Sequence, residues 1–279
     1  MKLLFCGVRG STPAPGADFV RYGGNTTCLA VTPDGGPPRL VLDAGTGLAN
    51  LSSRLDGEAF RGTILLGHLH WDHTHGLPFF AAGDRDDSEV TVLMPAQGDP
   101  EDILARVLSP PHFPITPSQL RGCWRFGSVE EGTHEIEGLT VVAREIPHTG
   151  GRTFGYRVSD GRASFAYLSD HMPIALGPGE EGLGEYHDAA LELARGVDLL
   201  VHDGQHLAAQ FPEVAYLGHS AVEYAVGLAR TAGARGLMLF HHDPRRTDDD
   251  LDAIVARHRT GAVPVDAAAE GTVVVLPTP

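Results

Sequence analysis

Short runs of apolar residues, separated by glycine, proline and aspartate, recur along the chain. Apolar runs of about four to eight residues bounded by such turn-forming residues are typical of β-strands. We therefore predict strands at residues 2–6, 28–32, 39–43, 63–67, 89–94, 139–145, 163–169, 198–202, 236–241 and 272–276.

Helical periodicity of the apolar positions is found at fewer places. It predicts helices at 100–108, 186–195, 220–232 and 249–258, with Ser220 as the N-cap of the third. Strands thus dominate the first half of the chain, and strands alternate with helices mainly in the second half. This order favours a layered α/β architecture in which sheets pack between helices. Because no linker or repeat interrupts the pattern, we expect one domain over residues 1–279.

Two segments lack this periodicity and are expected to be loops. Residues 81–88 are rich in charged side chains, and residues 109–121 (SPPHFPITPSQLR) are rich in proline. The second segment is long for a plain connection between two elements. We therefore expect it to act as a lid that limits access to a functional site.

The most informative stretch is ILLGHLHWDHTHG, residues 64–76. Its apolar start predicts a buried strand, and His68 and His70, two residues apart, project to the same side of an extended chain. Asp72 and His73 follow where the chain turns. Imidazoles and a carboxylate at this density suit zinc and, less specifically, manganese or iron. So short a segment cannot surround an ion, and further ligands must come from elsewhere. A surface loop with incidental histidines would instead leave these groups unpaired.

Net charge restricts the class of partner. The formal net charge is −15, and an acidic chain repels phosphate backbones at long range. We therefore expect no long nucleic acid as a partner, whereas a small anionic substrate is compatible because a metal site reverses the local field. No stretch reaches the roughly 18 apolar residues that span a membrane, so we expect no membrane partner.

The cysteines and the first residues indicate the cellular compartment. Cys6, Cys28 and Cys123 lack CxxC spacing and are odd in number, so they form neither a zinc-thiolate motif nor a disulfide framework. We expect them to be buried free thiols in a reducing compartment. The opening MKLLFCGVRGS has too short an apolar run for a signal peptide. Both observations predict a cytoplasmic protein. The oligomeric state stays open, with a homodimer as one alternative.

The segment HLHWDH (68–73) matches the HxHxDH motif of the metallo-β-lactamase superfamily, which the chain resembles over nearly its whole length. Further pieces occur in the family's order: LDAGTG before the motif, then IPHTG, YLSDH and LMLFHHDP. The resemblance implies an αββα four-layer sandwich with a dinuclear metal site at one edge. The segments GVRGSTPAPGADFVRYGGNTTC, VDLLVHDGQH and LGHSAVEYAVGLARTAGARGLMLFHH are similar to the phosphodiesterase branch, which includes ribonuclease Z, phosphoribosyl cyclic phosphodiesterase and certain cyclic-nucleotide phosphodiesterases.

The resemblance also implies two divalent metal ions, for which we expect zinc and keep manganese or iron as alternatives. The implied ligands are His68, His70 and His148 for one ion, Asp72, His73 and His241 for the other, and Asp170 bridging both. This count leaves room for a bridging water, which two cations about 3.5 Å apart convert to a nucleophilic hydroxide.

The candidate catalytic residues are Asp72, His219 and Asp203. A leaving alkoxide needs a proton, and His219 resembles the proton-donating histidine of the phosphodiesterase branch. Asp203 follows the predicted strand 198–202 and should lie close enough to keep His219 charged near neutral pH. The alternative is that His219 only closes the turn before Ser220.

Several of these assignments have rivals. His242 competes with His241, which we prefer because it ends the apolar run GLMLF, and His171 competes with Asp170. Asp43 either orients a ligand histidine or simply forms a turn.

Other polar residues are weaker candidates. Arg9 and Arg21 could meet a phosphate, and His112 could reach over the site from its loop. His75 is expected to be a helix-start residue. No chemical role is expected for His134, His187, His202, His206 and His258.

Our leading functional hypothesis is a phosphodiesterase for a small, cyclic nucleotide-like substrate. Hydrolysis of a carboxylic ester, thioester or lactone by the same hydroxide is one alternative, and a non-catalytic metal-binding protein is another. Ribonuclease Z itself is disfavoured, because no cluster of lysine and arginine forms the basic arm expected for transfer RNA.

Overall fold

The computed structural model describes residues 1–33 and 35–276. The first of its two sheets comes from the N-terminal half of the chain and is completed by the last strand. Its strands are β1 (Lys2–Gly7), β2 (Cys28–Thr32), β3 (Leu40–Leu42), β4 (Arg61–Leu65), β5 (Glu89–Pro95), β6 (Cys123–Val129) and β14 (Val273–Val275). They lie in the order β14-β1-β2-β3-β4-β5-β6. Neighbours are antiparallel from β14 to β3 and parallel from β3 to β6.

The second sheet comes from the C-terminal half. Its strands are β7 (Gly132–Ile136), β8 (Leu139–Glu145), β9 (Phe154–Ser159), β10 (Ser164–Leu168), β11 (Leu199–Asp203), β12 (Leu237–Phe240) and β13 (Val265–Ala267). Their order is β13-β12-β11-β10-β9-β8-β7. Strands β10 to β13 run parallel, and β7 to β10 run antiparallel.

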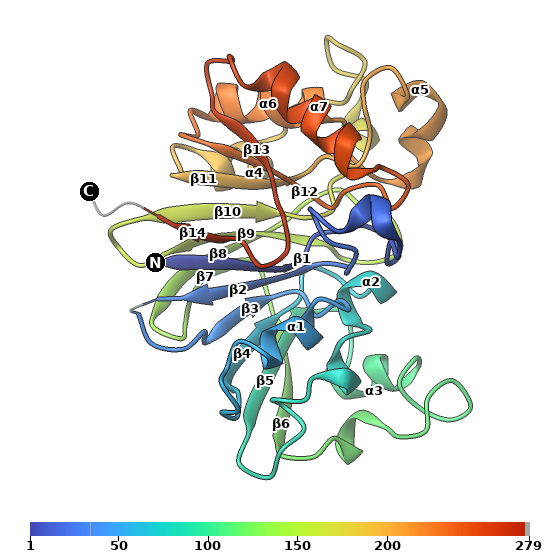
Figure 1. Ribbon diagram of the computed structural model, residues 1–279, viewed down its shortest axis with the longest axis vertical. Helices are drawn as coiled ribbons and strands as arrows, with labels where there is room; N and C mark the ends of the chain where they lie inside the picture. The colour runs from blue at the N-terminus through green and yellow to red at the C-terminus, as the bar shows by residue number, and fades with distance from the viewer. Residues whose placement is uncertain (34, 277–279) are drawn as a thin grey trace.

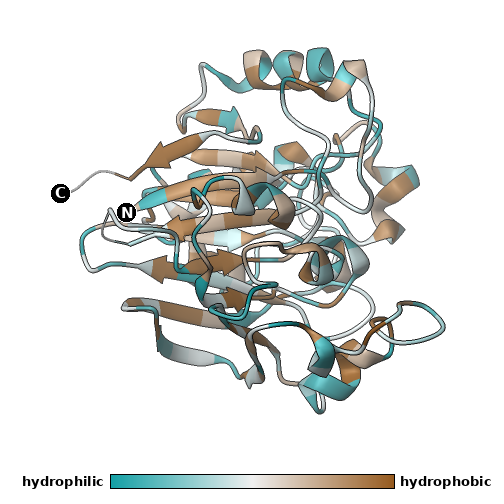
Figure 2. Cartoon of the chain, turned by 60° about the horizontal axis from the view of Figure 1, so that its bottom comes forward, coloured by the Kyte–Doolittle hydropathy of each residue, from teal (hydrophilic) through white to brown (hydrophobic). Residues whose placement is uncertain are grey.

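Three apolar layers hold the two sheets and their helices together. The central layer lies between the sheets and contains Phe5, Leu65, Tyr156 and Phe240. The outer layers lie beneath helices. On the first sheet these are α1 (Leu48–Ser52) and α3 (Pro100–Ala105), and on the second they are α4 (Asp188–Ala194), α5 (Phe211–Val214), α6 (Val222–Ala232) and α7 (Asp248–His258). The single turn of α2 (Trp71–Thr74) lies at one end of the first sheet. Figure 2 shows the strands mostly apolar and the outer helices mixed. The expected αββα four-layer sandwich is confirmed.

The sequence pattern missed four strands, β6, β7, β9 and β13. Strands β6 and β7 form outer edges of their sheets, and their residues alternate between exposed and partly buried. An edge strand needs no continuous apolar run, so its signal is weak. Helix α6 begins at Val222, and the predicted N-cap is wrong: Ser220 instead donates its hydroxyl to the carbonyl of His171 over 2.7 Å.

The parallel strands bring chemistry-bearing residues to one edge of the sandwich. Strand β11 ends at Asp203, and β10 and β12 end just before Ser169 and His241. Because these strands run parallel, the residues that end or follow them meet at the same edge. The connection after β4 reaches this edge from the first sheet and continues into α2 (Figure 1).

Two expectations from composition have mixed outcomes. All three cysteines are free, but only Cys6 and Cys28 are buried, so the expected burial of Cys123 is wrong. Among the residues that the structure describes, no helix is long and apolar enough to cross a membrane.

Candidate metal centre

The HLHWDH segment is shaped by the end of β4 and the single turn of α2. The amide of Gly67 donates to Asp43 Oδ1 over 2.7 Å, where the chain leaves the sheet. The His68 and His70 rings then lie 4.3 Å apart, centre to centre, as their two-residue spacing predicts. The amide of His73 donates to the carbonyl of His70, which closes the turn and places Asp72 and His73 beside the first two histidines.

The first group of converging side chains is His68, His70, His148 and Asp170, whose ligand-type atoms lie within 4.8 Å of one another. His148 Nδ1 donates to the carbonyl of Gly218 over 2.8 Å, which fixes the tautomer and leaves Nε2 as an acceptor. That Nε2 lies 3.3 Å from His70 Nδ1 and 3.6 Å from Asp170 Oδ2. The downstream histidine is thus oriented toward the motif.

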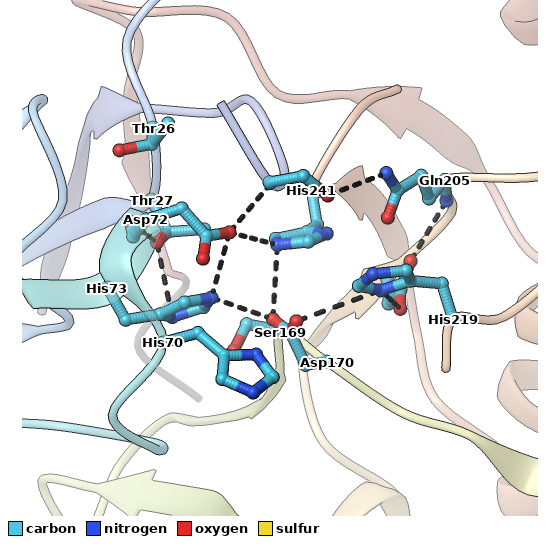
Figure 3. A network of polar contacts seen from close by, with 12 residues as sticks. Thr26, Thr27, His70, Asp72, His73, Ser169, Asp170, Gln205, His219 and His241 are labelled. Atoms are coloured by element: carbon cyan, nitrogen blue, oxygen red, sulfur yellow. Dashed lines mark hydrogen bonds and ion pairs between the residues drawn. The ribbon is translucent and has the colours of Figure 1, made fainter. Parts of the chain in front are cut away.

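The second group is Asp72, His73, Asp170 and His241, with the same limit of 4.8 Å. His241 Nε2 lies 3.1 Å from Asp72 Oδ2 and 3.2 Å from Asp170 Oδ1. His73 Nε2 lies 3.3 Å and 3.0 Å from the same two oxygens. Figure 3 shows these four side chains as a closed ring of contacts. Asp170 belongs to both groups, which is the position of a bridging ligand.

Unpaired buried atoms indicate what this arrangement needs. Both ring nitrogens of His68 are buried without a hydrogen-bond partner, and His73 Nε2 and Asp170 Oδ1, although 3.0 Å apart, are buried without forming a hydrogen bond. Such atoms are costly to bury unless a cation binds them. Neutral imidazole and carboxylate donors that converge on a common point suit zinc and other divalent ions. The residues therefore fit divalent metal.

The pKa shifts agree with a site built for positive charge. Burial raises the pKa of the Asp170 carboxyl, but His241, His73 and His68 outweigh that effect and hold it well below its usual range. Burial lowers the pKa of His241, yet the nearby Asp170 and Asp72 carboxylates outweigh it and raise the value to about 9. The raised pKa of His241 reports the negative field of these carboxylates, and that field also favours a bound cation.

Asp43 supports the centre from behind. Its Oδ2 accepts from His73 Nδ1 over 2.8 Å and from the Tyr167 hydroxyl over 2.7 Å, and its Oδ1 accepts from Gly67. The side chain is fully buried. A carboxylate that orients a metal-binding histidine is a common arrangement. The turn-only alternative for Asp43 is wrong.

Backbone conformation aims His241 at the centre. The residue has a φ of 56°, in the left-handed region, and its ring lies against the backbone of Gly10. A Cβ at Gly10 would overlap the His241 ring, so any other residue at position 10 would displace that ring. His242 points elsewhere, because its Nε2 donates to the carbonyl of Ala268 over 2.9 Å. The geometry favours His241 over His242 as the candidate ligand.

His219 and Asp203 form a pair next to the centre. His219 Nδ1 lies 3.0 Å from Asp203 Oδ2 and 3.7 Å from Asp170 Oδ2, and its ring stacks on that of His241 at 4.9 Å. Burial raises the pKa of Asp203, but His219 outweighs it and lowers the value, so Asp203 is ionised. The pair thus has the partnership that the sequence predicted, although His219 also belongs to a third convergent group with Asp203 and His241.

A pocket of about 390 Å³ opens beside the two groups and exposes some of their side chains. It is lined by Ser11, Leu69, His70, Trp71, Asp72, His148, Asp170, Leu217 and His219. Ser11 was missed by the sequence analysis. Its amide donates to Asp72 Oδ2 over 2.7 Å, and its hydroxyl accepts from Gln205 Nε2 over 3.1 Å. The Gly-rich opening of the chain was the available signal.

Other candidates lie away from the pocket. Arg9 is fully buried and donates to the carbonyls of Gly23 and Arg246, so the expectation that it meets a phosphate is wrong. Arg21 instead pairs with Asp249 and Asp252 of α7.

The segment 109–121 and the remaining histidines do not contribute to the pocket either. No residue of 109–121, and hence not His112, is among those that line it, so the lid expectation lacks support. His171 bonds to His202 and His187 rather than joining either group of four described above, and His75 forms the C-cap of α2 rather than its start.

Comparisons with known proteins place this fold and site in a family. The family model described as "Beta-lactamase superfamily domain" matches residues 38–242. Ribonuclease BN of Escherichia coli O6:K15:H31 (strain 536 / UPEC) is 43% identical over 240 residues, which cover 71% of this chain and 75% of the relative. Ribonuclease Z of Geobacillus kaustophilus (strain HTA426) is 26% identical over 235 residues, with the same two coverages, 71% and 75%.

Solved structures agree on the fold. The short form of human tRNase Z has a TM-score of 0.69 at 19% identity, covering 99% of this chain and 100% of that one. The metallo-β-lactamase fold protein YhfI from Bacillus subtilis has a TM-score of 0.72 at 18% identity, covering 98% and 99%. Since the family model spans well over half of the chain and the sequence relatives are nucleases, this protein belongs to the β-lactamase superfamily and is one of its hydrolases.

Proposed function

We propose that this protein is a dinuclear metal-dependent phosphodiesterase that acts on a small, nucleotide-like phosphodiester. The observation that supports it is a His–Asp pair, His219 and Asp203, at the same pocket as two convergent ligand groups that share Asp170. Cleavage of a phosphodiester with an alkoxide leaving group needs both a nucleophile and protonation of the leaving oxygen. The arrangement provides separate residues for the two tasks.

Two divalent ions, with zinc expected and manganese or iron as alternatives, would supply Lewis acidity and an activated water when bound. The residues proposed to hold them are His68, His70 and His148 for one ion, Asp72, His73 and His241 for the other, and Asp170 for both. Asp43 and the Gly218 carbonyl orient two of these imidazoles. Asp72 also accepts from the Ser11 amide, which ties the opening loop to the centre.

His219 is the proposed proton donor. Asp203 accepts from its Nδ1 and so orients the ring, which leaves Nε2 as the atom that would face the leaving oxygen. Aryloxide leaving groups such as nitrophenolate need no such proton, whereas an alkoxide does. His219→Ala should therefore slow an alkyl phosphodiester by roughly 10²–10⁴-fold and a nitrophenyl phosphodiester far less.

The matched control is His206→Gln. His206 is buried, and its ring lies 5.9 Å from that of His219, but it belongs to none of the convergent groups and does not line the pocket. His206→Gln should leave the ratio of the two hydrolysis rates, alkyl ester to nitrophenyl ester, unchanged. Metal content should be unchanged in both His219→Ala and His206→Gln. An equal loss on both esters in His219→Ala would assign His219 to binding or folding and remove the general-acid role.

Substrate size is the finer part of the proposal. The net charge of −15 and the pocket of about 390 Å³ favour a small ligand. The names of the relatives, ribonuclease Z and ribonuclease BN, conflict with our expectation that long nucleic acid is no partner. Substrate size and class are tested by comparing the rates at which the protein cleaves cyclic and linear phosphodiesters, a transfer-RNA precursor and a lactone. Faster cleavage of the RNA would overturn the size limit, and faster cleavage of the lactone would overturn the phosphodiesterase. A homodimer stays a prediction.

A further inference from the structure

The pocket at the metal centre combines two chemically different surfaces. Six of its lining residues are polar and include the candidate ligands, whereas the apolar ones are Leu69, Trp71 and Leu217. Trp71 is 63% exposed and Leu217 is 43% exposed, which is unusual for large apolar side chains. A substrate that matches both surfaces carries an anionic group beside a flat apolar group.

Trp71 is fixed in place next to the centre. It stands between His70 and Asp72 in the motif, and its carbonyl accepts from the amide of His75 in the turn of α2. The ring of His75 stacks against the indole, with centroids 5.6 Å apart and planes 15° apart. One face of the indole therefore packs against an imidazole, while most of the side chain faces solvent. A preoriented aromatic surface binds a flat ring with little further loss of conformational freedom.

Leu217 extends the apolar surface from the other side of the chain. It is the last residue of the 3-10 turn Ala215–Leu217, and the next residue, Gly218, accepts from His148. Both apolar residues are thus one position away from residues that belong to, or hold, the metal centre. The backbone therefore holds Trp71 and Leu217 close to the metal centre.

We propose that Trp71 is a stacking platform for the nucleobase of the substrate, so that the enzyme selects nucleobase-bearing phosphodiesters over alkyl ones. This inference rests on the proposed phosphodiesterase function. Every base has a π-face, and stacking on an exposed aromatic side chain contributes to affinity without reading base identity. The neutral indole also accepts a base without adding to the repulsion between an acidic protein and an anionic ligand.

The first test uses the fluorescence of Trp71. The protein has two tryptophans, so Trp124→Phe leaves Trp71 as the only one. Adenosine 5′-monophosphate, added to this metal-loaded variant, should quench the fluorescence saturably, and ribose 5-phosphate should not. Equal quenching by both compounds, or none by either, would overturn the platform.

The second test uses two substrates with the same leaving group, the p-nitrophenyl ester of thymidine 5′-monophosphate and methyl p-nitrophenyl phosphate. Trp71→Ala should lower the ratio of their kcat/KM values by about 10-fold, mainly through KM, and Trp71→Phe should restore most of it. Phe79→Ala is the control, because Phe79 is 65% exposed nearby in sequence but does not line the pocket.

The outcomes separate this inference from the proposed function. An unchanged ratio in Trp71→Ala would overturn the platform while the phosphodiesterase stands. Selective quenching by the nucleotide without turnover of any phosphodiester would support the platform and overturn the proposed function. A change in oligomeric state of Trp71→Ala, with the ratio unchanged, would show that the indole is a protein contact and overturn the platform.

Discussion

The Asp43 carboxylate offers a sharp test of how the centre is organised, through the substitution Asp43→Asn. Asp43 has a φ of 60°, a conformation that asparagine tolerates as well as aspartate does, so the exchange adds no backbone strain. The carboxylate accepts from Gly67 on one oxygen and from His73 and Tyr167 on the other. An amide has only one acceptor oxygen, and its NH₂ group must face a donor on one of the two sides.

The expected cost has two parts. One buried donor loses its acceptor, which lowers the free energy of unfolding by about 1–3 kcal/mol. His73 also loses its charged partner, so metal affinity should fall by roughly 10–100-fold. Because His73 belongs to only one ligand group, the loss should affect one ion of the two. A chelator-competition titration should then show one weakened site and one unchanged site.

The control for this variant is Asp160→Asn. Asp160 also accepts from backbone amides, those of Arg162 and Ala163, but it lies in a turn outside every convergent group. It should leave both metal affinities unchanged. If Asp43→Asn bound both ions as tightly as the unsubstituted protein, the carboxylate would have no part in holding His73 for metal, and the reasoning would fail.

Two further predictions concern the neighbourhood of His241. Gly10→Ala should displace the His241 ring and reduce metal content, measured by elemental analysis. Gly236→Ala should not, because Gly236 has no positive φ and the nearest atom would lie 3.5 Å from an added Cβ; full metal content in Gly10→Ala would contradict the packing argument. Burial lowers the pKa of His242 to about 3, below its unfolded value of about 6.5, so the unfolded state binds the extra proton and stability falls with decreasing pH between those values. Between pH 7 and pH 5 this proton lowers the free energy of unfolding by about 2 kcal/mol. The variant His242→Gln should keep its metal, and its free energy of unfolding in urea should fall by about 2 kcal/mol less over the same pH range. An identical pH dependence in the two proteins would refute the assignment to His242.

The apolar runs predicted a layered α/β architecture, whereas the four-layer sandwich and the full ligand set came from the resemblance to the metallo-β-lactamase superfamily. The buried strands β10, β11 and β12 are continuous apolar runs, and the end of each run marks the sheet edge where Asp170, Asp203 and His241 gather. Strand β9, Phe154–Ser159, was missed because Gly155 and Arg157 interrupt the run, although Phe154, Tyr156 and Val158 alternate on its buried face. Alternation was the signal that could have found it.

The sequence does not show which residues far apart along the chain contact one another. Nothing local indicates that Arg9 is fully buried with the Asp243–Asp248 turn rather than available to a phosphate. Nor does it show that Ser11 donates to Asp72, or that segment 109–121 stays outside the pocket. These facts depend on how loops pack after the sheets have formed, and such contacts leave no periodicity in the chain.

The division of the ligand groups between the two sheets gives the ions a mechanical role. His68 to His73 follow β4 of the first sheet, whereas His148, Asp170 and His241 follow strands of the second. Bound metal would therefore cross-link the halves of the sandwich at one edge, where unpaired polar atoms replace the apolar packing of the centre. Because the metal would bind only the folded state, its binding free energy would add to the free energy of unfolding. Removing the ions would open this edge first, so the loops around the site become cleavable by proteases before the core between the sheets does.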